Sequence, residues 1–193
     1  KPVNISFVEA AAVPMAAVTA LQALRDKGQI KSRQKVLING ASGGVGTFAV
    51  QIAKSLGAEV TGVCSTRNLD ILRSIGADRV IDYTKEDFTK KTQCYDLILA
   101  VNGYHPISAY KRALNSHGRY VMVGGGGAQL TEAIVQGPFI TLTGNKEMGN
   151  MLQRANQKDL IFMKELLENG KVKPVIDKTY NLSDTPEALK YFE

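Results

Sequence analysis

Several residue types are scarce in this chain of 193 residues, and each scarcity excludes a class of protein. The sequence has no tryptophan, only two cysteines and only two histidines. Two distant cysteines with no histidine at metal-ligand spacing cannot form a zinc ribbon or a disulfide framework. We therefore expect Cys64 and Cys94 to be reduced thiols and the protein to be cytoplasmic.

Long hydrophobic runs and blocks of like charge are also missing. No apolar run approaches the roughly 20 residues that a membrane-spanning helix needs, and the first residues do not follow the pattern of a signal peptide. The formal net charge is +6, but lysine and arginine are scattered among aspartate and glutamate, without a basic block interleaved with aromatic residues. We therefore expect neither a membrane nor a nucleic acid as a partner.

Short apolar strands alternate with helical segments along most of the chain. Near-continuous runs of Val, Ile and Leu at 36–38 and 97–99 are typical of strands buried on both faces. The alternation predicts an α/β fold of the Rossmann type, a doubly wound parallel sheet of six strands with helices on both faces. The expected strands are Lys35–Asn39, Glu59–Cys64, Arg79–Ile81, Asp96–Val101, Arg119–Val123 and Phe139–Leu142. The expected helices are 8–27, with a break near Pro14, Val45–Leu56, Asn68–Ile75, Pro106–Leu114 and Lys158–Glu168, with glycine stops at 28, 57, 76 and 170.

One glycine-rich turn joins the first predicted strand to a helix. It reads Gly40-Ala-Ser-Gly-Gly-Val-Gly46, so that Ala41 replaces the first glycine of G-x-G-x-x-G while Gly43 and Gly46 keep the second and third. A helix N-terminus presents unpaired N–H groups and partial positive charge, and glycine lets a phosphate approach the backbone. The turn therefore predicts a dinucleotide site; the alternative is that its glycines only pack the strand against the helix.

The end of the second predicted strand bears on the choice between NAD and NADP. A site that prefers NAD usually has an acidic residue there, about 20 residues after the glycine motif. This chain has Ser65, Thr66 and Arg67 instead. Two hydroxyls and a guanidinium suit a 2′-phosphate, which a carboxylate would repel. We therefore expect NADP(H) as cofactor; the alternative is that Ser65 only caps the next helix and Arg67 is solvated.

A catalytic acid or base is not evident from the sequence. His105 precedes a proline at a strand end, and His117 lies in a predicted turn at 115–118; both positions are typical of surface loops. Asp82 and Asp96 are isolated carboxylates that we expect to form caps or turns. No catalytic residue is therefore assigned.

Five spaced motifs occur in order along the chain: Asn39–Gly46, Gln51–Lys54, Leu56–Ala58, Ser74–Asp78 and Val80–Tyr83. Together they resemble the medium-chain dehydrogenase/reductases, and within them the zinc-independent quinone oxidoreductase branch. The resemblance implies a Rossmann domain and a GroES-like catalytic domain. Residues 1–30 would be an interdomain helix region, 31–171 the Rossmann domain and 172–193 the start of a segment that returns to the catalytic domain, most of which would lie outside this chain.

The resemblance also implies roles for individual residues. Thr19 would lie near the nicotinamide ring. Met15 stands where zinc alcohol dehydrogenases have a zinc-binding cysteine, four residues before that threonine; a thioether is a poor zinc ligand, so we expect no metal. The other implied contacts are Ser42, Gly43, Gly44 and Val45 to the pyrophosphate, Ser65 and Arg67 to the 2′-phosphate, Tyr83 near the adenosine phosphate, and Asn102, Gly103 and Gly124 along the path to the nicotinamide.

The activity that the resemblance implies is hydride transfer from NADPH to a small-molecule electron acceptor, a quinone or an α,β-unsaturated carbonyl. Two alternatives stay open: an NADP-dependent alcohol dehydrogenase of the same superfamily, and a nucleotide-binding module that is inactive on its own. Family members often pair through an edge of the Rossmann sheet. We therefore expect a homodimer, with the predicted strand Phe139–Leu142 at that edge.

Overall fold

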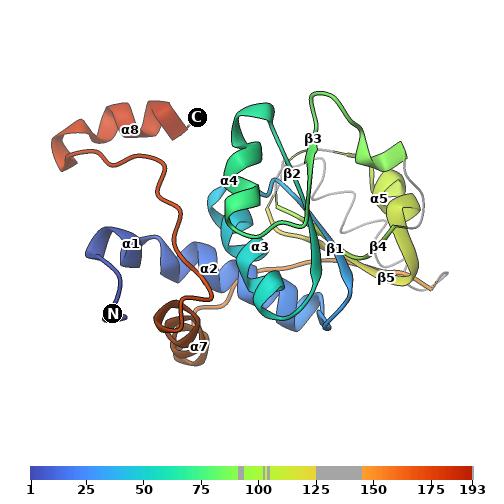
Figure 1. The fold of residues 1–193 in the computed structure, drawn as a ribbon, viewed down its shortest axis with the longest axis horizontal. Coiled ribbons are helices and arrows are strands. Elements are labelled where there is room, and N and C mark those ends of the chain that lie inside the picture. Colours follow the sequence, from blue (N-terminus) through green and yellow to red (C-terminus); the bar gives the residue numbers. More distant parts are fainter. Residues whose placement is uncertain (91–93, 102, 104, 125–144, 193) are drawn as a thin grey trace.

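The computed structural model describes residues 1–90, 94–101, 103, 105–124 and 145–192. Within them, six strands form one parallel sheet in the order β3-β2-β1-β4-β5-β6 (Figure 1). This is the order of a doubly wound Rossmann sheet, in which the direction of winding reverses between β1 and β4, and it confirms the predicted fold class. The strands are β1 (Lys35–Asn39), β2 (Glu59–Cys64), β3 (Arg79–Asp82), β4 (Tyr95–Ala100), β5 (Leu114–Met122) and β6 (Glu147–Asn150).

Helices cover both faces of the sheet, as predicted. Because successive side chains of a strand point to opposite faces, Val36 and Ile38 of β1 pack in one hydrophobic cluster with α2 and α3, whereas Leu37 packs in a second cluster with α5. The helices are α1 (Phe7–Ala11), α2 (Val13–Gln22), α3 (Gly44–Ser55), α4 (Leu69–Ser74), α5 (Ile107–Ala113), α7 (Gln157–Glu168) and α8 (Thr185–Phe192). A π-helical turn at Ala23–Lys27 extends α2, and 3-10 turns occur at Thr66–Asn68, Phe88–Lys90 and Leu182–Asp184.

The N-terminal helix has the predicted break. α1 ends before Ala12, and Pro14 lies in the first turn of α2, where a missing N–H removes no intrahelical bond. The π-helical turn ends at the predicted Gly28, where a Cβ would lie 2.8 Å from the carbonyl oxygen of Leu24. Ala17 and Leu21 of α2 are fully buried in the same cluster as the sheet. The domain divisions at residues 30 and 171 stay predictions.

Two strands differ from the expectation. β5 begins at Leu114, so the predicted turn at 115–118 is wrong: these residues lie within the strand. The pairing of β5 with β4 is irregular there, and His117 has a φ of 64°, which explains the turn-like sequence. β6 has the polar sequence Glu-Met-Gly-Asn, which gave no strand pattern. The predicted strand Phe139–Leu142 lies outside the described residues.

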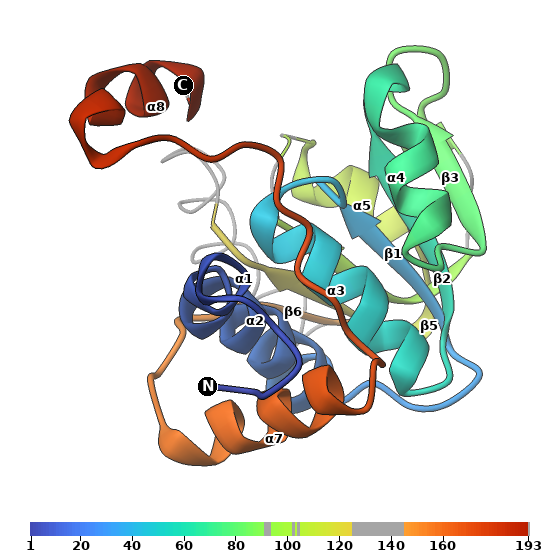
Figure 2. The same cartoon turned by 60° about the vertical axis from the view of Figure 1, so that its left-hand side comes forward.

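The C-terminal segment passes beside α3 and ends in α8, which lies apart from the sheet (Figure 2). Residues 173–181 have no regular secondary structure. The side chain of Gln51 in α3 holds the start of this segment: its Nε2 donates to the carbonyl oxygen of Lys173 at 2.9 Å, and its Oε1 accepts from the N–H of Lys173 at 2.8 Å. None of the helices in the described part of the chain has the length and apolar character needed to span a bilayer.

Candidate cofactor-binding site

The glycine-rich turn connects the carboxyl end of β1 to the N-terminus of α3, as predicted. Gly43 is the N-cap residue, with extended backbone (φ −76°, ψ 172°), and no side chain caps the helix. The N–H groups of the first helical turn and the positive end of the helix dipole are therefore available to an anion.

The glycines of this turn are required for different reasons. A Cβ at Gly46 would lie 2.2 Å from the carbonyl oxygen of Gly40 and 2.7 Å from the Cα of Ala41, so only glycine lets the helix pack on the turn. A Cβ at Gly43 would meet nothing closer than 3.6 Å, and one at Gly44 nothing closer than 4.0 Å. A purely structural reading therefore explains Gly46, whereas the open space at Gly43 and Gly44 fits the close approach of a phosphate.

Asn68 links the glycine-rich turn to the segment that follows β2. Its Nδ2 donates to Ser42 Oγ at 3.0 Å and to Ser65 Oγ at 3.4 Å. Since both serine oxygens act as acceptors here, the hydroxyl protons of Ser42 and Ser65 are left to donate to an anion. Sequence reasoning missed Asn68, because a single asparagine carries no pattern; its place just after β2 was the only signal.

Ser65 and Arg67 lie after β2, where the sequence places them. The side chain of Ser65 makes no capping bond to the following 3-10 turn. Arg67 is exposed, and within the described ranges its guanidinium makes no hydrogen bond or ion pair. Thr66 differs from the expectation: its hydroxyl donates to Asp82 Oδ2 at 2.5 Å, so its proton is not available to a phosphate.

Asp82, the last residue of β3, is a well-bonded carboxylate. Besides Thr66, its donors are the N–H of Thr84 at 3.0 Å and the hydroxyl of Thr84 at 2.7 Å, both to Oδ1. The hydrogen bond from Thr66 above all, with those from Thr84, holds the pKa of Asp82 below its usual value. Burial and this nearby carboxylate raise the pKa of Cys64 to about 11, so Cys64 is an unreactive thiol. Tyr83 follows with a side chain that is 60% exposed.

Cys64 and Cys94 form no disulfide in the described part of the chain; that both are reduced thiols stays a prediction.

Asn39, at the end of β1, supports the turn after β4. Its Nδ2 donates to Tyr110 Oη at 2.9 Å and to the carbonyl oxygen of Gly103 at 3.3 Å, and the Tyr110 hydroxyl donates to the same carbonyl at 3.2 Å. Gly103 has a φ of 88°, a conformation that favours glycine. Gly124 follows the end of β5, and Asn102 lies outside the described residues. The ends of β1 and β4 meet at the point where winding reverses, the usual ligand crevice of such sheets.

Thr19 lies buried in α2, and its hydroxyl donates to the carbonyl oxygen of Met15 at 2.7 Å. A Cβ built at Gly44 would lie 4.0 Å from the Cβ of Ala16, which puts α2 beside the N-terminus of α3. The Met15 side chain is 69% exposed. Among the residues that the structure describes, no three His, Cys, Asp or Glu side chains group as metal ligands; that the protein works without metal stays a prediction.

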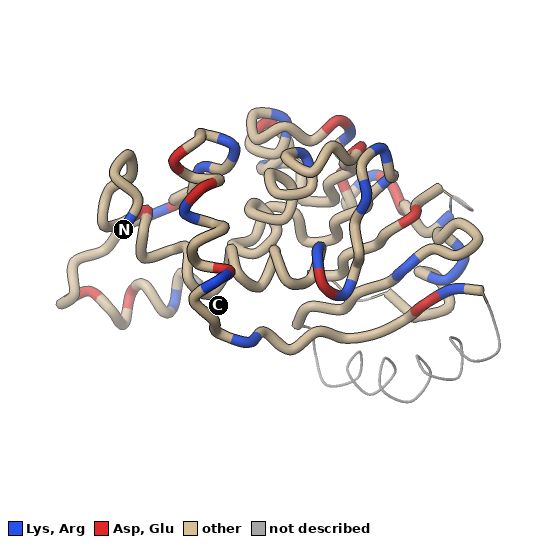
Figure 3. Tube along the Cα trace, turned by 90° about the horizontal axis from the view of Figure 1, so that it is seen from below, with Lys and Arg blue, Asp and Glu red and all other residues tan. Residues whose placement is uncertain are grey.

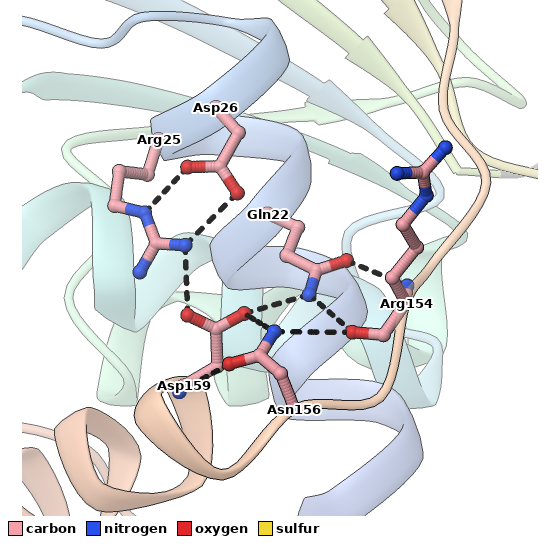
Figure 4. Close-up of polar contacts among 6 residues, drawn as sticks. All are labelled: Gln22, Arg25, Asp26, Arg154, Asn156 and Asp159. Carbon is pink, nitrogen blue, oxygen red and sulfur yellow. Dashed lines mark hydrogen bonds and ion pairs between the residues drawn. The ribbon is translucent and has the colours of Figure 1, made fainter.

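A second polar cluster joins the end of α2 to the start of α7 (Figure 4). The Asp159 carboxylate accepts from Gln22 Nε2 at 2.6 Å and from Asn156 Nδ2 at 2.7 Å, and it pairs with the Arg25 guanidinium at 2.7 Å. Gln22 also donates to the carbonyl oxygen of Arg154 at 2.7 Å and accepts from its N–H at 2.9 Å. These residues line a cavity of about 760 Å³. Because the polar side chains of the cluster are paired with one another, we assign them a structural role.

Charges of both signs are mixed over the described chain (Figure 3). Several form surface ion pairs, such as Lys54 with Asp78 at 2.7 Å and Arg119 with Glu147 at 2.7 Å. This distribution differs from the single basic face that nucleic-acid binding requires; the exclusion of nucleic acid stays a prediction.

The chain matches a family model described as a zinc-binding dehydrogenase over residues 75–193. It is 35% identical over 198 residues to a chloroplast envelope quinone oxidoreductase homolog of Arabidopsis thaliana, covering 97% of this chain and 59% of that protein. It is also 35% identical over 198 residues to a 2-methylene-furan-3-one reductase of Solanum lycopersicum, covering 100% of this chain and 46% of that protein.

Among solved structures, the quinone oxidoreductase from Coxiella burnetii matches with a TM-score of 0.83 at 29% identity, over 97% of this chain and 57% of that one. The chain thus spans about half the length of the curated relatives it matches. Since the family match extends over more than half of the sequence, the chain belongs to the zinc-binding dehydrogenase family, within the medium-chain dehydrogenase/reductase superfamily.

Proposed function

We propose that this chain binds NADP(H) across the carboxyl ends of its strands, and that the complete protein uses it to reduce a quinone or an α,β-unsaturated carbonyl. The observation that carries the proposal is the uncapped N-terminus of α3, with open space in front of Gly43 and Gly44. A diphosphate is the anion that such a site accepts in folds of this type.

Each part of the cofactor has residues suited to hold it. Ser42, Gly43, Gly44 and Val45 would bind the pyrophosphate through a hydroxyl and main-chain N–H groups. Tyr83 would lie beside the adenosine. Gly103 and Gly124 would let the nicotinamide half approach the backbone, and Thr19 in α2 would contact its ring.

The preference for NADP(H) over NAD(H) follows from the segment after β2. A carboxylate that would bond the ribose hydroxyls of NAD is missing there, whereas Ser65 has a hydroxyl proton to donate and Arg67 is exposed without an acidic partner in the described ranges. A guanidinium binds a phosphate through paired charge-assisted hydrogen bonds. Both features favour the phosphorylated coenzyme.

When bound, the nicotinamide ring supplies the hydride. This chain binds and orients the coenzyme, and the side chains of the glycine-rich turn and of α2 exclude water from its faces. Two relatives support the class of acceptor, because their names refer to a quinone and to a methylene-furanone, both electron-poor. Such acceptors need no metal to polarise them, so the reaction proposed here uses none.

Titration of NADPH and NADH, followed by cofactor fluorescence, tests the cofactor assignment. We expect Arg67→Ala to weaken NADPH binding by about tenfold or more, the worth of a hydrogen bond to a charged group, and to change NADH binding by less than about twofold. Arg73→Ala, which removes an exposed arginine of α4 that pairs with Asp70, is the matched control and should change neither. An unchanged NADPH affinity in Arg67→Ala would contradict the phosphate assignment.

Turnover is tested separately. The complete protein should oxidise NADPH with a quinone or an enone, whereas this chain alone should bind NADPH without turnover. Equal turnover by both would contradict the view that the acceptor site needs residues outside this chain. Turnover with primary alcohols and NADP⁺ in place of quinones would favour the alcohol dehydrogenase alternative.

We also propose a homodimer that forms through the edge of the sheet. β6 is the last strand of the described sheet on that side, with a neighbour in β5 only, and an edge of this kind can pair with a second copy. Sedimentation equilibrium would give twice the monomer mass; a monomer at micromolar concentration would contradict the proposal.

A further inference from the structure

We propose that Asp82 is a positioning residue for the choice of coenzyme: it fixes the segment that presents Ser65 and Arg67 to the 2′-phosphate. The inference rests on the proposed function. It addresses an apparent conflict, because a charged carboxylate near a phosphate site opposes the binding of that phosphate.

The sheet brings the two segments together. β2 and β3 are parallel neighbours, and Cys64 pairs in register with Asp82, so the segments after both strands start side by side. The N–H of Tyr83 donates to the carbonyl oxygen of Cys64 at 3.1 Å, which extends the pairing by one residue. Beyond that point the connection depends on side chains.

Asp82 makes that connection with both of its oxygens. Oδ2 accepts from the Thr66 hydroxyl, in the segment after β2, and Oδ1 accepts from the N–H and hydroxyl of Thr84, in the segment after β3. The short distance of 2.5 Å from Thr66 is that of a charge-assisted bond. The carboxylate thus holds Thr66, which stands between Ser65 and Arg67, against the end of β3.

The hydroxyl groups of Thr66, Thr84 and Ser65 use their protons in different ways, and the difference suits this role. Thr66 and Thr84 each have one proton and give it to Asp82, although their own oxygens lie 3.3 Å apart. Ser65 accepts from Asn68 and keeps its proton for a ligand. The charge of Asp82 is balanced by these donors and by Lys85, whose Nζ lies 3.7 Å away. Arg67 makes no ion pair with Asp82, so its guanidinium stays available to the phosphate.

An amide replaces the carboxylate only in part. Asparagine has one acceptor oxygen, which could still accept from Thr84, and an NH₂ group, which could donate to the hydroxyl oxygen of Thr66. These bonds would be neutral and weaker than the charge-assisted bonds to a carboxylate. Asp82→Asn therefore weakens the connection, and Thr66→Val breaks it from the other side without removing the charge.

Calorimetric titration with adenosine 2′,5′-bisphosphate and with AMP isolates the adenosine end of the site. We expect Thr66→Val and Asp82→Asn each to weaken binding of the bisphosphate by about fivefold, the worth of one or two hydrogen bonds, and to change AMP binding by less than about twofold. Thr61→Val is the matched control: it removes a threonine hydroxyl within β2 itself, which bonds to Tyr95 at a distance from the strand end. It should change neither affinity.

A double-mutant cycle measures the coupling between Thr66 and Arg67, which a merely structural role of Thr66 would not produce. In the Arg67→Ala background, Thr66→Val should cause a clearly smaller loss of bisphosphate affinity than it does alone, because one of the two residues that it positions is gone. An additive loss would overturn the inference. Tighter bisphosphate binding in Asp82→Asn would also overturn it, because the carboxylate would then only repel the phosphate. An equal loss of affinity for the bisphosphate and for AMP would overturn it as well.

A failure of the proposed function and a failure of this inference alone would give different results. If the unaltered protein binds AMP as tightly as the bisphosphate, the proposed NADP preference is wrong and this inference falls with it. If the unaltered protein prefers the bisphosphate and both variants keep that preference, only the role of Asp82 is wrong. Urea unfolding of each variant establishes that the protein titrated is folded.

Discussion

Gly43 and Gly46 belong to one turn, yet the surrounding atoms constrain them in opposite ways. A methyl group at Gly46 would overlap the main chain of Gly40 and Ala41, whereas one at Gly43 would extend into open space. Gly43 also has a φ of −76°, which alanine adopts without strain. Gly46 is therefore required by the fold, and Gly43 by the ligand that we propose.

This contrast predicts two different phenotypes for the same substitution. Gly46→Ala should lower the free energy of unfolding by about 1–3 kcal/mol, because the main chain must shift to admit the methyl group. Gly43→Ala should stay within about 1 kcal/mol of the unaltered protein but lose NADPH affinity, since its methyl group occupies the space of the pyrophosphate. Urea unfolding and NADPH titration measure both effects. Unchanged NADPH binding in Gly43→Ala would place the pyrophosphate elsewhere.

The sequence predicts site residues that belong to a local pattern and misses those that act through distant partners. The turn at 40–46 and the pair Ser65 and Arg67 lie at strand ends that apolar runs had marked. Asn68, by contrast, acts by bonding to Ser42, 26 residues away, and the partner of Thr66 lies 16 residues away in Asp82. Such pairs leave no periodic signal, because they depend on which strands become neighbours.

At the scale of elements, two glutamines fasten irregular segments to helices. Gln22 of α2 binds both the N–H and the carbonyl oxygen of Arg154, and Gln51 of α3 does the same with Lys173. Both side chains are nearly buried. In each case a side-chain amide pairs with one residue of main chain as a neighbouring strand would, so a segment without regular structure meets its hydrogen-bonding needs.

Removing Gln22 should therefore loosen α7 from α2. Gln22→Ala leaves the main chain of Arg154 and one bond of Asp159 without partners, and we expect a loss of about 2–3 kcal/mol in the free energy of unfolding. The control is Gln157→Ala, at the exposed first position of α7, where we expect a change within about 0.5 kcal/mol. Equal effects of the two substitutions in urea unfolding would contradict the role of Gln22.

The Asp159 cluster also predicts a dependence on pH. Burial alone would raise the pKa of Asp159, but hydrogen bonds from Gln22, Asn156 and Arg25 outweigh it and hold the pKa below its usual value. A carboxyl with a lowered folded-state pKa stabilises the protein above its unfolded pKa of about 3.9, and this stabilisation is lost as the pH falls through the folded-state pKa.

Urea unfolding between pH 2 and pH 7 measures this contribution. We expect the free energy of unfolding to fall as the pH drops below about 4, and to fall less steeply in Asp159→Asn, which has no proton to take up at that position. Asp70→Asn, at a highly exposed carboxylate of α4, should follow the unaltered protein. Parallel pH profiles for Asp159→Asn and the unaltered protein would contradict the prediction.

The elements that the sequence predicts well are those whose burial is visible along the chain. The apolar runs predict the bounds of β1, β2 and β4 to within one residue, because these strands are covered on both faces. β6 lies at the edge of the described sheet and has only Met148 buried. Its strand conformation is set by pairing with β5, so no local apolar pattern could indicate it.

At the scale of the whole molecule, the described residues form a core around the sheet, whereas the terminal segments expose large apolar side chains. Both hydrophobic clusters close around the sheet within the described residues. Large apolar side chains stay exposed in the terminal segments, among them Phe7 at 81% and Leu182 at 92%. Because most of the core side chains come from the sheet and the helices that cover it, we expect this chain to fold and bind its coenzyme by itself, and we expect folding and binding to be coupled.

That coupling predicts a shift in thermal stability. The proposed contacts come from α2, from the turn before α3 and from segments after β2, β3, β4 and β5, so no part of the unfolded chain can bind the coenzyme as the folded protein does. NADPH at about 100 times its dissociation constant should add about 2.7 kcal/mol to the free energy of unfolding. For a domain of this size, that raises the thermal midpoint by about 5–11 °C.

The shift in the thermal midpoint should depend on which coenzyme is bound and on the guanidinium of Arg67. NADH at the same concentration should give a smaller shift, and Arg67→Ala should reduce the shift with NADPH to that with NADH. Differential scanning calorimetry over a series of NADPH concentrations measures the effect, with Arg73→Ala as the control. If NADPH binds in titration but leaves the midpoint unchanged, it binds the unfolded chain as well as the folded one, and a site assembled from six separate segments cannot behave in that way.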